Sequence, residues 1–276
     1  MKDLTAYFRR INLSRPAHPD LAALAAIMEA HSRAIAFENC DVVLNQKISI
    51  AHEDIEAKLV DGGRGGYCFE QNTLLQMALK ELGFTVTPLL CRVRWNKPDD
   101  TAGPNTTFTH MALSVALETG DYLADVGFAG LASIAPVALS STEPQTLPEG
   151  QFRVVDGSAG YATLQLLVKS EWRSLYTWRR NEAAALVDLE CANWISCTFP
   201  TARFTTSFFV CRVVDHERHH ILNDHYVKRT GHGHDCTVEQ ARIRDKAELL
   251  RLLESVFGLH FPLDTIGLDR YLPSTV

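Results

Sequence analysis

Hydrophobic residues in the first third of the chain recur at helical spacing. In segment 21–33 (LAALAAIMEAHSR) the apolar side chains repeat every three or four positions, and Asp20 is placed to cap the N-terminus of that helix. Residues 52–60 predict a shorter helix. Segment 68–82 also places its leucines on one side, and Gly83 follows it as a typical stop. This part of the chain is therefore predicted to be helical.

The middle of the chain instead alternates apolar and polar residues, as half-buried strands do. Segments 110–118 (HMALSVALE) and 122–128 (YLADVGF) are predicted to pair as a hairpin that turns at Thr119-Gly120. Further strand-like runs are 152–155, 161–168 and 171–178. Several short strands joined by turns predict a barrel or a small sandwich.

The last part of the chain mixes both patterns. Segment 204–214 (FTTSFFVCRVV) predicts a strand. Segment 248–258 (ELLRLLESVFG) predicts an amphipathic helix that begins with a capping box at Asp245 and Glu248. The sequence thus predicts an α+β fold in three regions, namely a helical region 1–84, a β-rich region 85–192 and a mixed region 193–276.

Composition restricts the class of protein further. With 276 residues, 46% hydrophobic and 22% charged, the chain has the balance of a soluble globular protein. The formal net charge of -6 and the absence of a Lys/Arg run argue against a nucleic-acid partner. The sequence shows neither a signal-peptide core nor an apolar run long enough for a membrane span, so we expect a cytoplasmic protein without a membrane partner. Its oligomeric state is not indicated.

Cys68 is the strongest candidate for chemistry, because it lies where a glycine-rich turn (DGGRGG) becomes the first turn of a helix. Unpaired N–H groups at a helix N-terminus stabilise a thiolate, which is the nucleophilic form of cysteine. The same groups can bind the oxyanion of a tetrahedral intermediate. The chain has seven scattered cysteines and no CxxC pair, so a disulfide framework is not expected. The alternative is a buried, inert thiol beside a flexible turn.

A nucleophilic cysteine needs a base, and the base needs an orienting group. His110 and Asp125, on the two strands of the predicted hairpin, suit these roles. A two-residue turn places Asp125 opposite Ser114, roughly 13 Å along the strand from His110, whereas a longer turn brings Asp125 opposite His110. In both registers the two side chains share one face. The alternative is a solvent-facing histidine and an aspartate that belongs to a turn.

Two further groups of residues carry charges or potential metal ligands. Arg64 and Glu38 can form a buried pair that braces the cysteine turn, or they can be two solvated charges. The histidine-rich segment 216–236 could in principle bind zinc, but its spacings match no usual finger and it resembles an exposed loop. We therefore predict no metal site.

Several motifs together resemble the arylamine N-acetyltransferase family over nearly the whole chain. RGGYCFE at 64–70 resembles the family's active-site cysteine segment, THMAL at 109–113 its histidine strand, and DVGF at 125–128 its aspartate strand. AYFRRI at 6–11 and AFENCDV at 36–42 match two N-terminal signatures. They occur in the family's order and spacing, which makes the combination specific.

The resemblance implies an N-terminal helical bundle, a central β-barrel and a C-terminal α/β lid around a papain-like core of Cys68, His110 and Asp125. It also implies a ping-pong reaction with acetyl-CoA as co-substrate. Cys68 would take the acetyl group and pass it to an arylamine, an arylhydrazine or an N-hydroxyarylamine, as in xenobiotic metabolism.

The resemblance also assigns residues to the two substrates. Thr109, Gly127 and Phe128 would lie near CoA. The aromatic acceptor would be lined by Phe37, Phe69, Phe128 and Phe204, which could equally be core residues. Two positions depart from the family pattern, since Ala129 stands where many relatives have glycine and Cys40 where a larger aliphatic residue is usual.

Two other functions use the same residues differently. In a transglutaminase-like enzyme or cysteine hydrolase, water or a lysine would attack the acyl-enzyme. In a non-catalytic binding protein, Cys68 would be inert. The combined RGGYCFE and N-terminal signatures favour the acetyltransferase.

Overall fold

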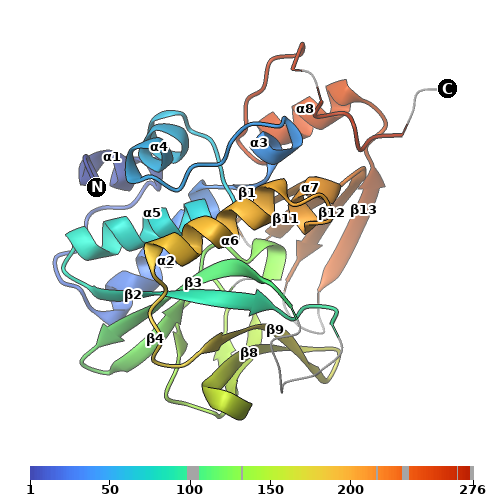
Figure 1. The fold of residues 1–276 in the computed structure, drawn as a ribbon. Helices are drawn as coiled ribbons and strands as arrows, with labels where there is room; N and C mark the ends of the chain where they lie inside the picture. Colours follow the sequence, from blue (N-terminus) through green and yellow to red (C-terminus); the bar gives the residue numbers. More distant parts are fainter. Residues whose placement is uncertain (98–105, 132, 216, 232–235, 266, 274–276) are drawn as a thin grey trace.

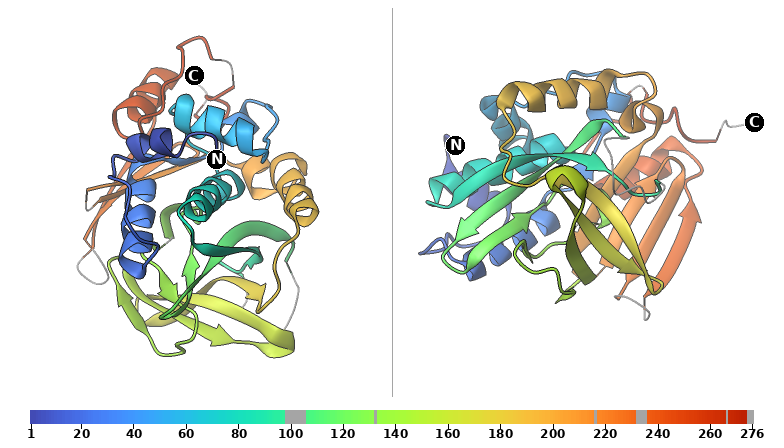
Figure 2. Two further views of the ribbon diagram at one scale, coloured as in Figure 1. Left: turned by 90° about the vertical axis from the view of Figure 1, so that its left-hand side faces the viewer. Right: turned by 60° about the horizontal axis from the view of Figure 1, so that its bottom comes forward.

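The computed structural model describes residues 1–97, 106–131, 133–215, 217–231, 236–265 and 267–273. The N-terminal helices lie on one side of a large curved sheet, and a second sheet lies beside it with the C-terminal helix at its end (Figure 1). The right-hand view of Figure 2 shows the two sheets, green to yellow and orange, next to each other. This mixed arrangement agrees with the predicted α+β class.

Helices occupy the first third of the chain, as the apolar spacing predicts. They are α1 Leu4–Arg10, α2 Leu21–Ala34, α3 Cys40–Val43, α4 His52–Ile55, the π-helix η1 Glu56–Asp61 and α5 Cys68–Glu81. The Asp20 side chain accepts a hydrogen bond from the Ala23 N–H at 2.8 Å, which confirms its role as a cap. The predicted helix 52–60 is present, but its second half winds as a π-helix.

The large sheet has eight strands in the order β5-β4-β3-β2-β9-β8-β7-β6. They are β2 Thr85–Val93, β3 Phe108–Leu117, β4 Gly120–Ala124, β5 Val137–Ala138, β6 Gln145–Leu147, β7 Gly150–Asp156, β8 Tyr161–Val168 and β9 Glu171–Arg179. The Gln145 side chain bonds both the N–H and the carbonyl of Ala138, so it joins the two edge strands. The sheet is thereby a nearly closed barrel, with the short 3₁₀ turns η2 Ala129–Leu131 and η3 Ser158–Gly160 between its strands.

The hairpin register differs from both predicted alternatives. Leu117 pairs with Gly120, so the turn residues are Glu118 and Thr119. Gly120 begins the return strand with a φ of 121°, a backbone conformation that glycine adopts without strain. Asp125 follows the last residue of β4 and is reached by a bend rather than by ladder pairing. The predicted turn at Thr119-Gly120 is therefore wrong by one position.

The second sheet has the order β1-β10-β11-β12-β13. Its strands are β1 Phe37–Glu38, β10 Phe209–Val214, β11 Glu217–Leu222, β12 His225–Thr230 and β13 Thr237–Arg242, and the remaining helices are α6 Leu186–Thr198, α7 Arg203–Thr206 and α8 Lys246–Ser255. The predicted strand 204–214 thus begins only at Phe209. Asp245 caps α8, but Glu248 bonds the N–H of Arg244 instead of completing the predicted box.

Apolar packing joins these layers into one body. The largest buried cluster combines residues of α1, α2 and α5 with Met111, Leu113 and Val115 of β3. The other face of β3 points into the barrel, where Ala112 packs with Cys91 and Tyr176. A third cluster lies between the second sheet and α8. Because the first cluster crosses the predicted boundary at residue 84, the three-region division stays a prediction. Among the described residues, no helix is long and apolar enough to cross a membrane.

Candidate active site

The local sequence places Cys68 as the first residue of α5, and its side chain is almost completely buried. The carboxylate of Glu70 accepts a hydrogen bond from the Tyr67 N–H at 3.0 Å, which fixes where the helix begins. A Cβ at Gly127 would lie 2.7 Å from the Cys68 Cα, so only glycine permits this approach. The thiol therefore projects at a helix N-terminus whose first N–H groups lack helical partners.

A buried ionic network braces the turn before Cys68. The Arg64 guanidinium contacts Glu38 and Asp41, both at 2.7 Å, and Lys58 contacts Asp41 and Glu70, also at 2.7 Å each. Of the two alternatives for Arg64 and Glu38, the structure thus has the ion pair and not the two solvated charges, and it adds members that the sequence did not indicate. Burial raises the pKa of Glu70 to about 7 although Lys58 opposes this shift. The network holds the two ends of the glycine turn together.

A second polar chain ties α5 to α1 and α2. The Tyr7 hydroxyl lies 3.0 Å from Nδ1 of His31, and Nε2 of His31 lies 2.7 Å from Oε1 of Gln71. Because that amide oxygen can only accept, Nε2 carries the proton. Burial lowers the pKa of His31 to about 4, so this histidine is neutral. The Gln71 amide in turn donates to the carbonyls of Ala36 and Gly66.

A β-bulge places His110 next to Cys68. Cys91 of β2 faces His110, whereas Arg92 faces Phe108, so Thr109 is the additional residue. The Thr109 carbonyl lies 3.6 Å from the Cys68 Sγ. Cys68 is also close enough to His110 to raise the pKa of its imidazole, and Nε2 of His110 lies 2.7 Å from Asp125 Oδ2. Since Nε2 serves the aspartate, Nδ1 is the ring nitrogen left for the thiol.

Asp125 is fully buried and held by several donors. Its Oδ1 accepts from Nδ2 of Asn72 at 2.9 Å and from the N–H of Gly127 at 2.8 Å. Burial would raise the pKa of Asp125, but the His110 charge and these hydrogen bonds outweigh it, so that pKa is lowered. Burial opposes a charged His110, yet Asp125 and Cys68 raise the pKa of His110 to about 10. The pair is therefore an imidazolium and a carboxylate at neutral pH.

Of the four predicted aromatic residues, Phe128 contacts His110, Phe37 and Phe204 pack against each other, and Phe69 lies in the core. Phe128 packs against His110 and Tyr176, with ring centroids 5.0 Å away in each case. The Phe37 and Phe204 rings are 5.8 Å apart. Phe69 contacts Tyr67 and is fully buried in the helical core. Phe69 is thus positioned as a core residue, while Phe204 is only partly buried.

Two residues that hold Asp125 and His110 in position, Asn72 and Tyr176, were not predicted from the sequence. Asn72 lies one turn after Cys68 on the same side of α5, and that i, i+4 relation was the available signal. Its amide donates to the Met111 carbonyl at 2.7 Å and its oxygen accepts from the Val126 N–H at 3.1 Å. Tyr176 lies over His110 at 4.7 Å, a contact between strands far apart in sequence that alternation cannot predict.

Cys40 and the histidine-rich segment do not join the site. Cys40 is buried, and burial followed by the Glu38 charge raises the pKa of its thiol well above the usual range. In segment 216–236, His219 bonds Tyr226 at 2.7 Å, while His232 and His234 lie outside the described residues. No three His, Cys, Asp or Glu side chains converge as metal ligands anywhere in the described ranges. Ala129 stands where many relatives have glycine, and its φ of 44° lies in the left-handed region that glycine adopts most easily.

Comparisons with known proteins agree with this geometry. An N-acetyltransferase family model matches residues 20–266. The arylamine N-acetyltransferase of Mycolicibacterium smegmatis is 37% identical, covering 93% of this chain and 92% of that protein. The Salmonella typhimurium arylamine N-acetyltransferase / N-hydroxyarylamine O-acetyltransferase is 34% identical, covering 93% and 88%. The structure of the Mycobacterium marinum arylamine N-acetyltransferase in complex with CoA has a TM-score of 0.90 at 32% identity, covering 98% and 100%. Because the family model matches most of the chain and these relatives are similar over more than nine-tenths of it, this protein is an acyltransferase that belongs to the arylamine N-acetyltransferase family.

Proposed function

We propose that this protein transfers an acetyl group from acetyl-CoA to arylamines, arylhydrazines or N-hydroxyarylamines through an acetyl-Cys68 intermediate. The observation that carries the proposal is that three side chains gather at one place. The Cys68 Sγ lies 3.6 Å from the carbonyl of Thr109, the residue before His110, and Nε2 of His110 lies 2.7 Å from Asp125 Oδ2. Family membership supports acetyl-CoA as the donor and an arylamine as the acceptor. The Salmonella relative's name supports hydroxyarylamines as acceptors.

At the start of the first half-reaction the proton of the Cys68 thiol already resides on His110, so a thiolate faces an imidazolium. The Cys68 sulfur attacks the thioester carbonyl of acetyl-CoA and forms a new C–S bond, with the negative charge on the carbonyl oxygen. N–H groups of the first turn of α5 are placed to bind this oxyanion. Collapse breaks the C–S bond to CoA, and the CoA sulfur takes the proton from His110. Because one thioester replaces another, this exchange is nearly isoenergetic.

In the second half-reaction the acceptor nitrogen attacks the acetyl carbon. His110 accepts a proton from that nitrogen, and the Cys68 thiolate leaves. Asp125 keeps the Nε2–H of His110 directed at its own carboxylate, so Nδ1 stays aimed at the reacting atoms. The high pKa of His110 favours the imidazolium form that stabilises the thiolate before attack and after release.

The residues that we assign to the two substrates lie close to Cys68 and His110. Thr109, Gly127 and Phe128 flank Cys68 and His110, which supports contacts with the reactive end of CoA. The CoA complex of the M. marinum relative supports binding of the same co-substrate. The partly buried Phe204 offers aromatic surface for the acceptor ring, and the buried Phe37 ring packs beside it at 5.8 Å.

The decisive test is the mass of the intact protein after brief mixing with acetyl-CoA and no acceptor, followed by peptide mapping. We expect one acetyl group on Cys68 that disappears when an arylamine is added. Cys40 is the internal control, since its buried thiol should stay unmodified. An acetyl group lost at the same rate without acceptor would favour a hydrolase. A folded protein without a Cys68 adduct would refute the proposed nucleophile.

A further inference from the structure

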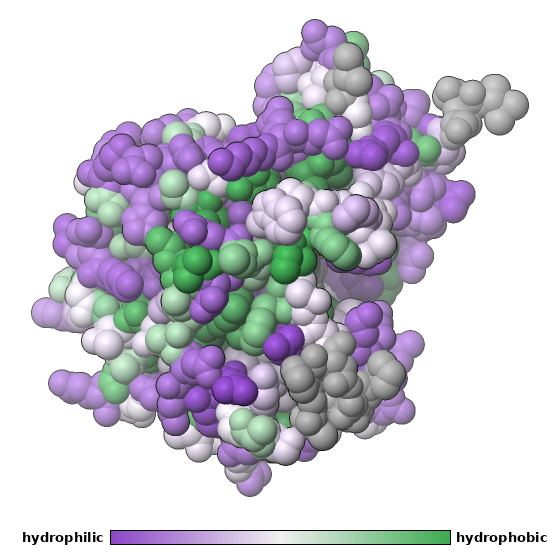
Figure 3. All heavy atoms as spheres, in the orientation of Figure 1, coloured by the Kyte–Doolittle hydropathy of each residue, from purple (hydrophilic) through white to green (hydrophobic). Residues whose placement is uncertain are grey.

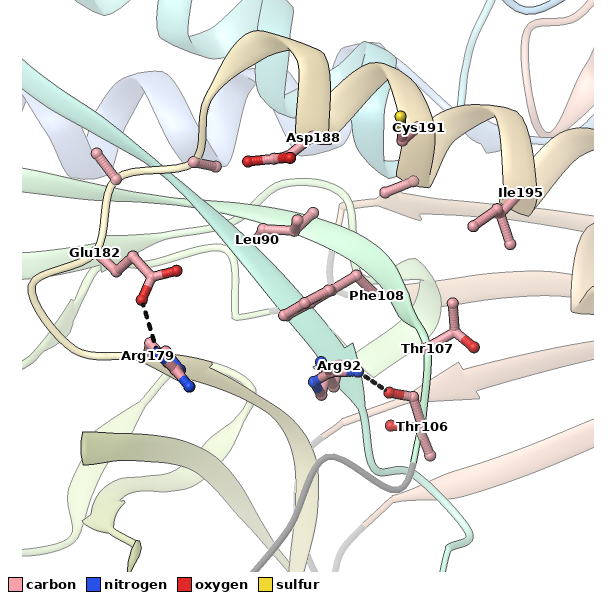
Figure 4. Close-up of a pocket in the computed structure, with 13 residues that line it drawn as sticks. Leu90, Arg92, Thr106, Thr107, Phe108, Arg179, Glu182, Asp188, Cys191 and Ile195 are labelled. Atoms are coloured by element: carbon pink, nitrogen blue, oxygen red, sulfur yellow. Dashed lines mark hydrogen bonds and ion pairs between the residues drawn. The ribbon is translucent and has the colours of Figure 1, made fainter. Parts of the chain in front are cut away.

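A cavity of about 550 Å³ lies between α6 and the outer surface of β2 and β3. Figure 4 shows Leu90 and Arg92 of β2 and Phe108 of β3 facing Asp188, Cys191 and Ile195 of α6 across it. None of Cys68, His110 and Asp125 lines the cavity. Its volume is in the range of small-molecule sites. It is therefore a space separate from the catalytic residues.

The lower side of the cavity in Figure 4 carries two arginines. Arg179 pairs with Glu182 at 3.4 Å. The Arg92 guanidinium lies 3.6 Å from the Phe108 ring centroid and donates to the Thr106 carbonyl. Among the described residues no carboxylate pairs with Arg92, and its buried Nε has no acceptor. Arg92 is thus, in the part of the chain that the structure describes, a cation without a carboxylate partner. Both guanidiniums lower the pKa of the neighbouring Tyr161, with Arg179 the larger cause.

The opposite side of the cavity is mostly apolar, apart from the Asp188 carboxylate. Its apolar lining consists of Leu90, Phe108, Ala192 and Ile195. The apolar character continues outward, because Val187 and Trp194 of α6 are more than half exposed. Figure 3 shows hydrophobic atoms gathered over this part of the molecule. At the Arg92 end, opposite Asp188, the cavity therefore suits a ligand that combines an apolar body with a negative charge.

We propose that this cavity binds a small aromatic carboxylate, with the carboxylate against Arg92 and the ring between Phe108 and α6. A carboxylate in the cavity would balance the charge of the Arg92 guanidinium, a group that binds carboxylates in proteins with charge-assisted hydrogen bonds. The planar ring suits the narrow space between a helix and a sheet and can stack on the arginine–phenylalanine pair. This site takes no part in the acetyl transfer proposed above and stands independently of it.

Cys191 provides a reporter within the cavity, because its thiol is exposed and lines the space. The experiment is peptide-resolved alkylation of the whole protein by iodoacetamide, with increasing 1-naphthoate. Cys236, which directly precedes β13 in the other sheet, is the reference thiol. The neutral 1-naphthamide has the same ring without the charge. Arg92→Gln removes the cation, Arg92→Lys retains it, and Arg180→Gln removes a neighbouring surface cation that does not line the cavity.

We expect 1-naphthoate to slow the alkylation of Cys191 in a saturable manner and to leave Cys236 unaffected. The amide should not protect. Arg92→Gln should weaken protection by about tenfold or more, as the loss of a charge-assisted hydrogen bond predicts. Arg92→Lys should weaken it less, and Arg180→Gln not at all. Unprotected Cys191 at the solubility limit, equal protection by the amide, or undiminished protection in a folded Arg92→Gln protein would each overturn the proposal.

Discussion

Asn72→Asp is the most direct test of how the catalytic geometry is maintained. The substitution keeps the shape of the side chain but replaces the Nδ2 donor by an oxygen. That nitrogen now donates to the Met111 carbonyl at 2.7 Å and to Asp125 Oδ1 at 2.9 Å. Both acceptors would then face a third acceptor inside a buried site. Asp125 would also gain a negative neighbour that competes for the charge of His110.

The structure permits an estimate of the size of this effect. Each buried group left without its partner costs about 1–3 kcal/mol. Two such losses, partly relieved by protonation of the new carboxyl, predict a decrease in the free energy of unfolding of about 2–4 kcal/mol. A displaced Asp125 also lets the imidazole turn away from Cys68. Misplacement of about 1 Å in a catalytic group can cost about 10²-fold in rate, and we expect a loss of kcat of this order.

The assay combines chemical denaturation with two rates, the alkylation of Cys68 by iodoacetamide and the steady-state acetylation of an arylamine. Gln76→Glu is the matched control, because it makes the same amide-to-acid change one turn later on α5. We expect the control to retain its Cys68 alkylation rate even where it lowers stability. If folded Asn72→Asp protein alkylates Cys68 and turns over at the rates of the unaltered enzyme, Asn72 does not position Asp125.

Four further outcomes are expected. Cys68→Ala should abolish acetyl transfer while the circular-dichroism spectrum stays unchanged, and residual turnover would contradict the nucleophile. Asp125→Asn should lower kcat severely, by up to about 10⁴-fold as in the serine-protease triad, with Cys68 still in place; near-normal turnover would make Asp125 structural. Since the folded pKa of His110 is raised to about 10 from an ordinary value near 6.5, its contribution to stability is complete below about pH 6.5 and is lost as the pH rises through 10. Denaturation at several pH values should show this loss, and it should be absent in His110→Gln. Gly127→Ala should cost about 1–3 kcal/mol by overpacking, because its Cβ would meet the Cys68 backbone at 2.7 Å; an unchanged melting curve would contradict this.

The sequence by itself determined the elements that carry the chemistry. Apolar spacing and Asp20 located α2, and the glycine turn followed by leucines located α5 with Cys68 at its start. Alternation placed His110 on a strand, and Met111 and Ala112 do lie on opposite faces of it. These features depend on helical and strand periodicity, which is local in the chain and therefore visible in the sequence.

Tertiary structure alone decided how these elements meet. The distance between His110 and Asp125 depends on a bend after Ala124 and on the bulge at Thr109, neither of which alters the apolar pattern. The ionic network around Arg64 joins residues from α3, η1 and α5. Likewise, the cavity beside Arg92 exists because α6 crosses β2 and β3, about a hundred residues away in the chain. Such contacts arise from the free energy of burying surfaces distant in sequence, for which periodicity holds no signal.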